Sequence, residues 1–161
     1  MESITYSPIG IINTPFSTPV GTPIQPVSGK GVDGTVEIFP EFEEGLSDLD
    51  GFSHIHLLFH MDRAPPMKLR ATPFVDTIER GIFSIRAPSR PNPIGMSIVQ
   101  LVRIDGNVLH IRDLDILDGT PLLDIKPYIP KTDCNPDARI GWLEGKEKRF
   151  STMKADDRFV E

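Results

Sequence analysis

The pattern of hydrophobic and polar residues predicts a chain built from short strands. Apolar and polar residues alternate over several stretches, as they do in strands with one buried face. The expected strands cover residues 4–12, 35–39, 52–60, 96–104, 108–117 and 122–129. Asp105-Gly106-Asn107 and Asp118-Gly119 are typical of hairpin turns between the last three strands. No long amphipathic helix precedes residue 137. The predicted fold is therefore all-β, a small antiparallel β-barrel with a few short helices.

Proline and glycine separate these strands. Residues 14–34 are rich in both and predict a long loop, which ends in a turn at Asp33-Gly34. A short helix is expected over residues 40–46, because proline is favoured at the start of a helix and carboxylates in its first turn. Residues 61–80 are rich in proline and basic side chains and predict a second long connection.

The most distinctive stretch covers residues 81–103. It contains Arg86, Arg90 and Arg103 but no acidic residue, and its middle reads APSRPNP. Proline fixes φ, removes a backbone donor and pushes the preceding residue towards an extended conformation. The middle is therefore a stiff loop between two apolar runs. A rigid loop with guanidinium groups and the amide of Asn92 is suited to hold an anion or a nucleobase. The alternative is a structural loop whose arginines pair with acidic neighbours.

The composition is that of an ordinary globular protein. A length of 161 residues with 39% hydrophobic and 25% charged residues predicts one domain with its own core. We divide it into a barrel domain, residues 1–136, and a C-terminal tail, residues 137–161, that packs on the barrel or extends it. The single cysteine, Cys134, excludes an internal disulfide. Without a signal-peptide pattern or an apolar run that spans a bilayer, we expect a cytoplasmic protein and no membrane partner.

The charge is distributed unevenly. The net charge of −6 disfavours a nucleic-acid partner, yet residues 63–104 contain seven basic and two acidic side chains. This imbalance predicts a local positive surface on an acidic protein. The alternative is that scattered surface charges cluster there by chance.

Three histidines share one face of the expected strand at 52–60. Because side chains alternate between the two faces of a strand, His54, His56 and His60 point to the same side. This arrangement is compatible with a transition-metal site. The alternative, a hydrogen-bonded polar strand face, is favoured because no carboxylate or fourth ligand is singled out. We therefore expect no metal. The sequence also lacks the phosphate-loop and dinucleotide fingerprints.

Motifs in three segments resemble those of a known family. They read FSHIHLLFHMDR (52–63), GIFSIRAPSRPNPIGMSIVQL (81–101) and LDILDGTPLLDIKPYIP (114–130). The start, ITYSPIGIINTPF (4–16), is also similar. The pair RPNPIG and DGTPxxDIKPY is highly specific. On these motifs the chain resembles the TsaA/TrmO family over roughly residues 4–130.

The resemblance implies a β-barrel methyltransferase that uses S-adenosyl-L-methionine and differs from Rossmann-type enzymes. The family's characterised activity is N6-methylation of threonylcarbamoyladenosine beside the anticodon of tRNA. The resemblance also implies a homodimer, with the cofactor in a cleft near the subunit interface. The bacterial type carries an extra C-terminal domain, and we expect a compact form here.

By position, the resemblance assigns cofactor contacts to several short segments. The family's Pro-Arg-Gln motif falls on Pro23-Ile24-Gln25, where isoleucine replaces arginine. The contact at this point is therefore expected from Gln25 and the backbone. The full set implied by the resemblance is Pro23, Ile24, Gln25, His60, Met61, Arg86, Met96, Asp115, Asp118, Gly119 and Thr120.

The substrate contacts are expected from the basic segment. Lys68, Arg70 and Arg90 have no carboxylate close by in the sequence pattern and are predicted to contact tRNA phosphates. Asn92 is suited to pair with an adenine edge, as asparagine does in nucleic-acid grooves.

The methyl-accepting nitrogen requires a base. An N6 that carries a carbamoyl group is a weak nucleophile until it loses its proton, so a base within hydrogen-bond reach is expected. Asp118 and His60 are candidates, and the sequence does not choose between them. Two rival functions stay open: a metal-dependent barrel enzyme that uses the three histidines, and a non-catalytic RNA-binding barrel.

Overall fold

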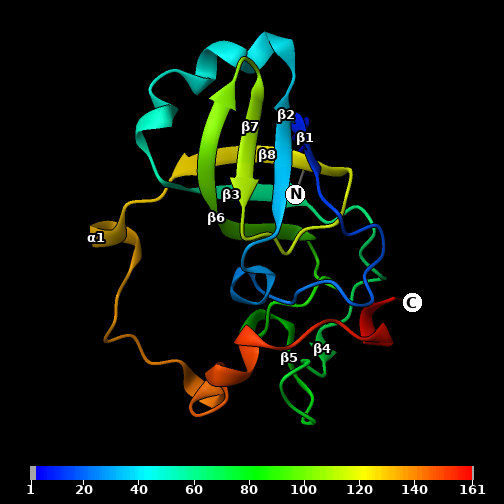
Figure 1. Cartoon of the computed structure of the whole chain (residues 1–161). Coiled ribbons are helices and arrows are strands. Elements are labelled where there is room, and N and C mark those ends of the chain that lie inside the picture. The colour runs from blue at the N-terminus through cyan, green and yellow to red at the C-terminus, as the bar shows by residue number, and fades with distance from the viewer. Residues whose placement is uncertain (1–2, 161) are drawn as a thin grey trace.

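The body of the protein is a closed antiparallel β-barrel. The computed structural model describes residues 3–160. Six strands pair in the order β1, β2, β7, β6, β3 and β8, and β8 pairs with β1 to close the barrel (Figure 1). They are β1 (Gly10–Asn13), β2 (Asp33–Ile38), β3 (His54–His60), β6 (Ile94–Asp105), β7 (Val108–Arg112) and β8 (Thr120–Pro127). The predicted all-β barrel is confirmed.

The remaining elements are short. Strands β4 (Arg70–Ala71) and β5 (Arg80–Gly81) form a separate two-stranded sheet below the barrel in Figure 1. Over residues 3–160, α1 (Pro130–Asp133) is the one α-helix. Short 3₁₀ helices cover Pro26–Gly29, Pro40–Leu46, Leu49–Gly51, Ile82–Ser84, Gly141–Leu143, Glu147–Ser151 and Asp157–Phe159. The helix expected over 40–46 is thus present. No helix in the described part of the chain is long and apolar enough to cross a membrane.

The core fills the barrel interior, as strand alternation requires. On β3, Ile55, Leu57 and Phe59 are buried, whereas His54 and His56 are half-buried on the outer face. Each fully buried aliphatic or aromatic side chain contributes about 1.5–3 kcal/mol through the hydrophobic effect. The buried core consists of Ile12, Val36, Ile38, Ile55, Leu57, Phe59, Val99, Leu101, Leu109, Ile111, Leu114, Ile116 and Leu122.

The predicted turn at Asp33-Gly34 is wrong. Both residues belong to β2, where Asp33 pairs with Arg112 and Gly34 with Ile111 of β7. A β-carbon on Gly34 would overlap the side chain of Leu114 and come within 2.6 Å of a backbone oxygen. Glycine is therefore needed here for close packing of the strand, and not for a turn.

The hairpin predicted at Asp118-Gly119 is also wrong. The turn at Asp105–Asn107 does join the paired strands β6 and β7, but β7 pairs with β2 and β6 whereas β8 pairs with β1 and β3. β7 and β8 therefore lie on opposite sides of the closed barrel, and residues 113–119 must cross its end. Leu114 and Ile116 are buried there and close that end of the core.

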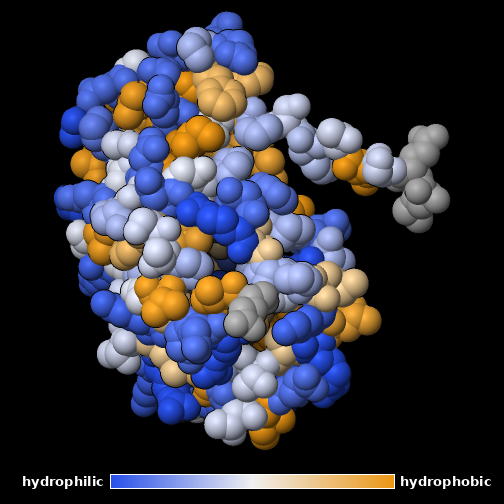
Figure 2. Space-filling model, turned by 90° about the vertical axis from the view of Figure 1, so that its right-hand side faces the viewer, coloured by the Kyte–Doolittle hydropathy of each residue, from blue (hydrophilic) through white to orange (hydrophobic). Residues whose placement is uncertain are grey.

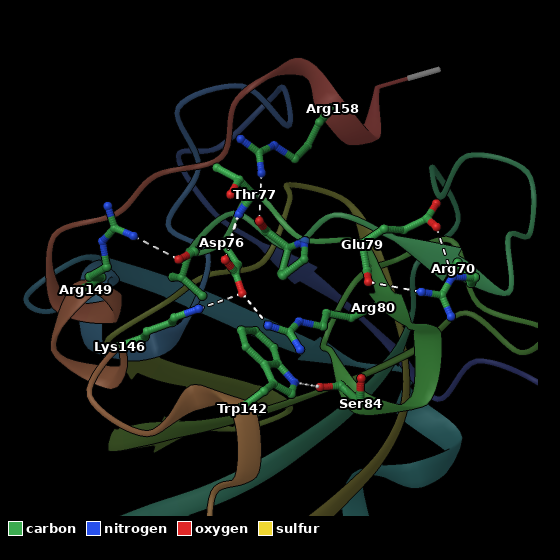
Figure 3. A network of polar contacts seen from close by, with 12 residues as sticks. Arg70, Asp76, Thr77, Glu79, Arg80, Ser84, Trp142, Lys146, Arg149 and Arg158 are labelled. Carbon is green, nitrogen blue, oxygen red and sulfur yellow. Dashed lines mark hydrogen bonds and ion pairs between the residues drawn. The ribbon is translucent and has the colours of Figure 1, made fainter.

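A C-terminal segment, residues 137–160, packs on the loops below the barrel. Its Lys146 Nζ lies 2.7 Å from Asp76 Oδ2, which also accepts a hydrogen bond from Arg80 Nη2 at 2.8 Å (Figure 3). Hydrogen bonds from Lys146 and then Arg80 hold the pKa of Asp76 well below its usual range. Further bonds run from Trp142 Nε1 to Ser84 O (2.8 Å), Arg149 Nη1 to Val75 O (2.9 Å) and Arg158 Nη1 to Pro73 O (2.7 Å).

We expect Gly95→Ala to destabilise the barrel. A β-carbon at Gly95 on β6 would overlap the ring of Phe59 on the paired strand β3. Overpacking of a filled core costs about 1–3 kcal/mol. Gly81→Ala is the matched control, because its β-carbon would meet no atom within 4 Å. Denaturant titration checks this, and equal stability of the two variants would contradict it.

Candidate functional site

A cleft of about 410 Å³ lies at the end of the barrel where β3 ends and β6 begins. The barrel side supplies Phe59, Met61 and the first residues of β6, together with the crossing segment 113–119. The opposite side comes from loops around 19–25 and 83–90 and from the C-terminal segment. Figure 2 shows a hollow at mid-height of the molecule, bordered by both hydrophobic and hydrophilic residues.

The proline-rich loop is held in place by its own arginine. Arg90 Nη1 donates to the carbonyl oxygens of Ile85 at 2.7 Å and Ile82 at 3.1 Å. Met61 N donates to Pro93 O at 2.8 Å, which fastens the loop to the end of β3. Arg90 lines the cleft, but its guanidinium group donates hydrogen bonds to the backbone of its own loop. The interpretation of Arg90 as a phosphate contact therefore does not match its hydrogen bonds.

Arg86 projects from the same loop and meets the first long loop. Its Nη1 donates to Gln25 Oε1 at 2.8 Å, and both side chains line the cleft. Pro23 and Ile24 line it too, with Ile24 half-buried and apolar. Ile24 brings no charge to this wall, where the cationic side chains are Arg86 and Arg90.

Asp115 is a half-buried acid of the cleft, whereas the other two carboxyl groups that line it, Asp62 and Asp156, are exposed. Burial raises the pKa of its carboxyl group to about 6, against a hydrogen bond from Ser97 and the charge of Arg86. Ser97 Oγ donates to Asp115 Oδ1 at 2.6 Å. The crossing of residues 113–119 over the barrel end places this carboxyl group between β6 and Arg86.

The turn at the end of the crossing segment is fastened to neighbouring loops by hydrogen bonds. Asp118 Oδ1 accepts a hydrogen bond from Thr14 N at 2.9 Å, and Arg63 donates to Asp118 O. Gly119 has φ 74°, a left-handed conformation that glycine adopts without strain. Thr120 is buried and its hydroxyl donates to Leu117 O at 2.7 Å.

The structure brings most of the expected cofactor residues together. His60, Asp118 and Gly119 do not line the cleft, and His60 is exposed at the end of β3. The expected residues that do line it are Pro23, Ile24, Gln25, Met61, Arg86, Met96, Asp115 and Thr120. Since these come from five separated parts of the chain, their convergence supports the site, while their contacts with a cofactor stay predictions.

Sequence reasoning missed Ser97 and the C-terminal segment. Ser97 faces the barrel interior between Gly95 and Val99, and a polar residue at an inward position of a strand was a signal that could have identified it. Asp156 and Phe159 of the C-terminal segment also line the cleft. No motif marked them, because their role depends on where the segment packs.

Two of the three strand histidines, His54 and His56, have ordinary partners. His56 Nε2 lies 3.1 Å from Asp133 Oδ2 of α1, and His54 Nδ1 lies 3.0 Å from Ser53 Oγ. The ring of Tyr128 packs edge-on against both histidines. Within residues 3–160, no three His, Cys, Asp or Glu side chains gather as metal ligands would.

Several arginines of the basic segment pair with carboxylates. Arg70 Nε lies 2.9 Å from Glu79 Oε2, so the expectation that it has no neighbouring carboxylate is wrong. Arg80 pairs with Asp76 and Arg103 with Asp105. Lys68 and Asn92 are exposed on the loops beside the cleft.

Fold and site together define a closed six-stranded antiparallel barrel with a cleft at one end. The family model for the tRNA-methyltransferase O N-terminal domain matches residues 11–134. A probable S-adenosyl-L-methionine-binding protein of Pyrococcus abyssi is 53% identical over 97% of this chain and 85% of its own length. A tRNA (adenine(37)-N6)-methyltransferase of Escherichia coli is 32% identical over 89% of this chain and 66% of its own length.

A solved structure agrees with this result. The crystal structure of TrmO from Pseudomonas aeruginosa matches with a TM-score of 0.75 and 39% identity, over 87% of this chain and 62% of that chain. The present chain therefore spans less than two thirds of that protein. The chain belongs to the TrmO family, and the resemblance noted in its sequence motifs is confirmed.

We expect Asp115 to make stability depend on pH. Its folded pKa, about 6, lies above the ordinary value of 3.8, so the folded state holds the proton between these pH values while the unfolded state loses it. The free energy of unfolding should therefore fall as pH rises from 4 to 6, by on the order of 2–3 kcal/mol.

Asp115→Asn should remove this fall, which denaturant titrations at pH 4, 5, 6 and 7 can measure. Asp124→Asn is the control, because Asp124 pairs with Lys126 on the barrel surface. A fall of the same size in Asp115→Asn would contradict the assignment.

Proposed function

We propose that this protein binds S-adenosyl-L-methionine in the cleft and methylates N6 of threonylcarbamoyladenosine beside the anticodon of tRNA. The observation that carries the proposal is the convergence of Gln25, Met61, Arg86, Met96 and Asp115 on one cleft. The names of the relatives in P. abyssi and E. coli support the cofactor and the reaction, respectively.

The residues of the cleft fit the chemistry of this cofactor. The half-buried carboxyl group of Asp115 is suited to face a sulfonium cation, and the guanidinium of Arg86 is suited to face a carboxylate. Phe59 and Met61 provide apolar surface for an adenine ring. When bound, the cofactor supplies an electrophilic methyl group.

The chain's contribution to the reaction is positioning and electrostatics. The transfer breaks a carbon–sulfur bond, forms a carbon–nitrogen bond at N6 and releases the N6 proton. Holding the two reactants in line supplies much of the rate. The loop from Arg86 to Pro93 is held by the Arg90 hydrogen bonds, so this wall of the cleft is rigid before any ligand binds.

The proton released from N6 needs an acceptor near the cleft. Asp118 accepts a hydrogen bond from Thr14 N and does not line the cleft, and neither does His60. Asp115, with its raised pKa, is a carboxyl group inside the cleft and joins them as a candidate for the base.

Lys68 and Asn92 are retained as proposed contacts with tRNA, and the homodimer stays a prediction.

We expect Arg86→Ala to weaken binding of S-adenosyl-L-methionine by about tenfold or more, since a hydrogen bond to a charged group is lost. Arg112→Ala is the matched control, because Arg112 pairs with Asp33 at 2.6 Å across β7 and β2. Its affinity should equal that of the wild type. Isothermal titration calorimetry measures both, and equal effects of the two substitutions would contradict the role of Arg86.

The reaction is tested with tRNA that carries threonylcarbamoyladenosine. Purified protein and S-adenosyl-L-methionine should add one methyl group to that nucleoside, as nucleoside mass spectrometry detects. The same tRNA without the threonylcarbamoyl group is the control substrate and should stay unmodified. If the protein binds the cofactor but methylates neither tRNA, cofactor binding stands and the proposed reaction is contradicted.

A further inference from the structure

A second cavity, of about 460 Å³, adjoins the cleft. The two share a wall that includes Ile24, Phe83 and Arg86. Its volume lies in the range of small-molecule sites. The cofactor assignment uses the first cleft and leaves this cavity without a ligand.

Five aromatic side chains stand among the residues that line the second cavity. Phe74 and Phe83 come from the segment below the barrel, and Trp142, Phe150 and Phe159 from the C-terminal segment. Aromatic side chains stack on nucleobases, at about 1–3 kcal/mol for each base. The C-terminal segment, which follows the residues matched by the family model, thus builds much of this cavity.

The charge of the cavity differs from that of the cleft. Its lining contains one cationic side chain, Arg86, and no acidic residue, whereas the cleft contains Asp115. A sulfonium cation therefore belongs beside Asp115. A planar neutral ring with a negatively charged substituent suits the aromatic cavity. Arg86 lines both spaces, and the five N–H donors of its guanidinium group allow it to face one carboxylate in the cleft and another in the cavity.

Trp142 is held rigidly at this wall. Its Nε1 donates to Ser84 O at 2.8 Å, and the guanidinium carbon of Arg80 lies 4.9 Å from the ring centroid (Figure 3). Lys146 Nζ lies 5.8 Å from the same centroid and also pairs with Asp76. A wall fixed by these contacts needs little reordering to bind a ring.

We propose that the aromatic cavity binds the adenine base that receives the methyl group, with the carboxylate of its threonylcarbamoyl substituent facing Arg86. This rests on the proposed function. The cavity and the cleft are lined in common by Ile24, Gln25 and Arg86, so a base in the cavity lies directly beside the cofactor, as transfer of a methyl group to N6 requires. Anticodon-loop bases are single-stranded and can be turned out into such a pocket.

The first test uses Trp142, the one tryptophan of the chain, as a reporter. Wild-type protein saturated with S-adenosyl-L-homocysteine is titrated with the nucleoside N6-threonylcarbamoyladenosine. The nucleoside should change Trp142 fluorescence with saturation, and more strongly than equal concentrations of uridine. S-adenosyl-L-homocysteine alone should change it little. A large saturable change with the cofactor product alone would place the cofactor in this cavity and overturn the proposal.

The second test fills the cavity. Val27 lines this cavity and not the cleft, so Val27→Trp should slow tRNA methylation by about tenfold or more while S-adenosyl-L-methionine affinity stays within about twofold. Val102→Trp is the matched control, on an exposed valine of β6 that lines neither cavity, and should methylate like the wild type.

The outcomes separate the two proposals. Methylation by Val27→Trp at the wild-type rate would overturn the base site and leave the proposed function intact. No methylation by wild-type protein would remove the proposed function itself. If Val27→Trp does not fold, the fluorescence titration of the wild type decides: saturation with the nucleoside supports the site, and no change in a protein that methylates tRNA overturns it.

Discussion

The site depends on one constraint of the closed barrel. β7 and β8 are neighbours in sequence but lie on opposite sides of the barrel, so the chain between them must cross its end. That crossing buries Leu114 and Ile116 in the core. The residue between them, Asp115, turns its carboxyl group to Ser97, which donates a hydrogen bond to it. The alternation of apolar and polar residues in this crossing resembles a strand, although the chain there pairs with no other strand.

The carboxyl group of Asp115 is costly to ionise, and its raised pKa is typical of a functional site. Burial raises the pKa of Asp115 to about 6, so at neutral pH the folded protein holds a charge that its surroundings only partly compensate. Buried groups with perturbed pKa values cluster at functional sites, where a ligand of opposite charge supplies the missing compensation. A cationic ligand in the cleft would supply it here.

The C-terminal segment is fastened by charge to the loops that form the other wall. Asp76 receives Lys146 from that segment and Arg80 from β5, so a single carboxylate joins two distant parts of the chain. Arg149 and Arg158 add hydrogen bonds to backbone carbonyls of residues 73–75. These contacts fix the aromatic side chains of the segment beside the cleft, which gives the segment a role in shaping both cavities.

The sequence by itself determined the class of fold and the nature of the loop. Alternation located four of the six barrel strands closely, because a half-buried strand needs that pattern. The strand expected at 4–12 begins only at Gly10, and the one expected at 108–117 ends at Arg112. Prolines made the loop after Arg86 stiff through local geometry. The family motifs also marked Arg86, Met96 and Asp115, which do meet in one cleft.

The tertiary structure decided which group each polar side chain meets. Arg90 meets carbonyl oxygens, and Arg70 meets Glu79. Arg86 meets Gln25, which lies 61 positions away. Such partners are set by contacts between segments far apart in the chain, and no local pattern encodes them. For the same physical reason, only the folded chain shows that residues 113–119 close the barrel and that the C-terminal segment forms a wall of the site.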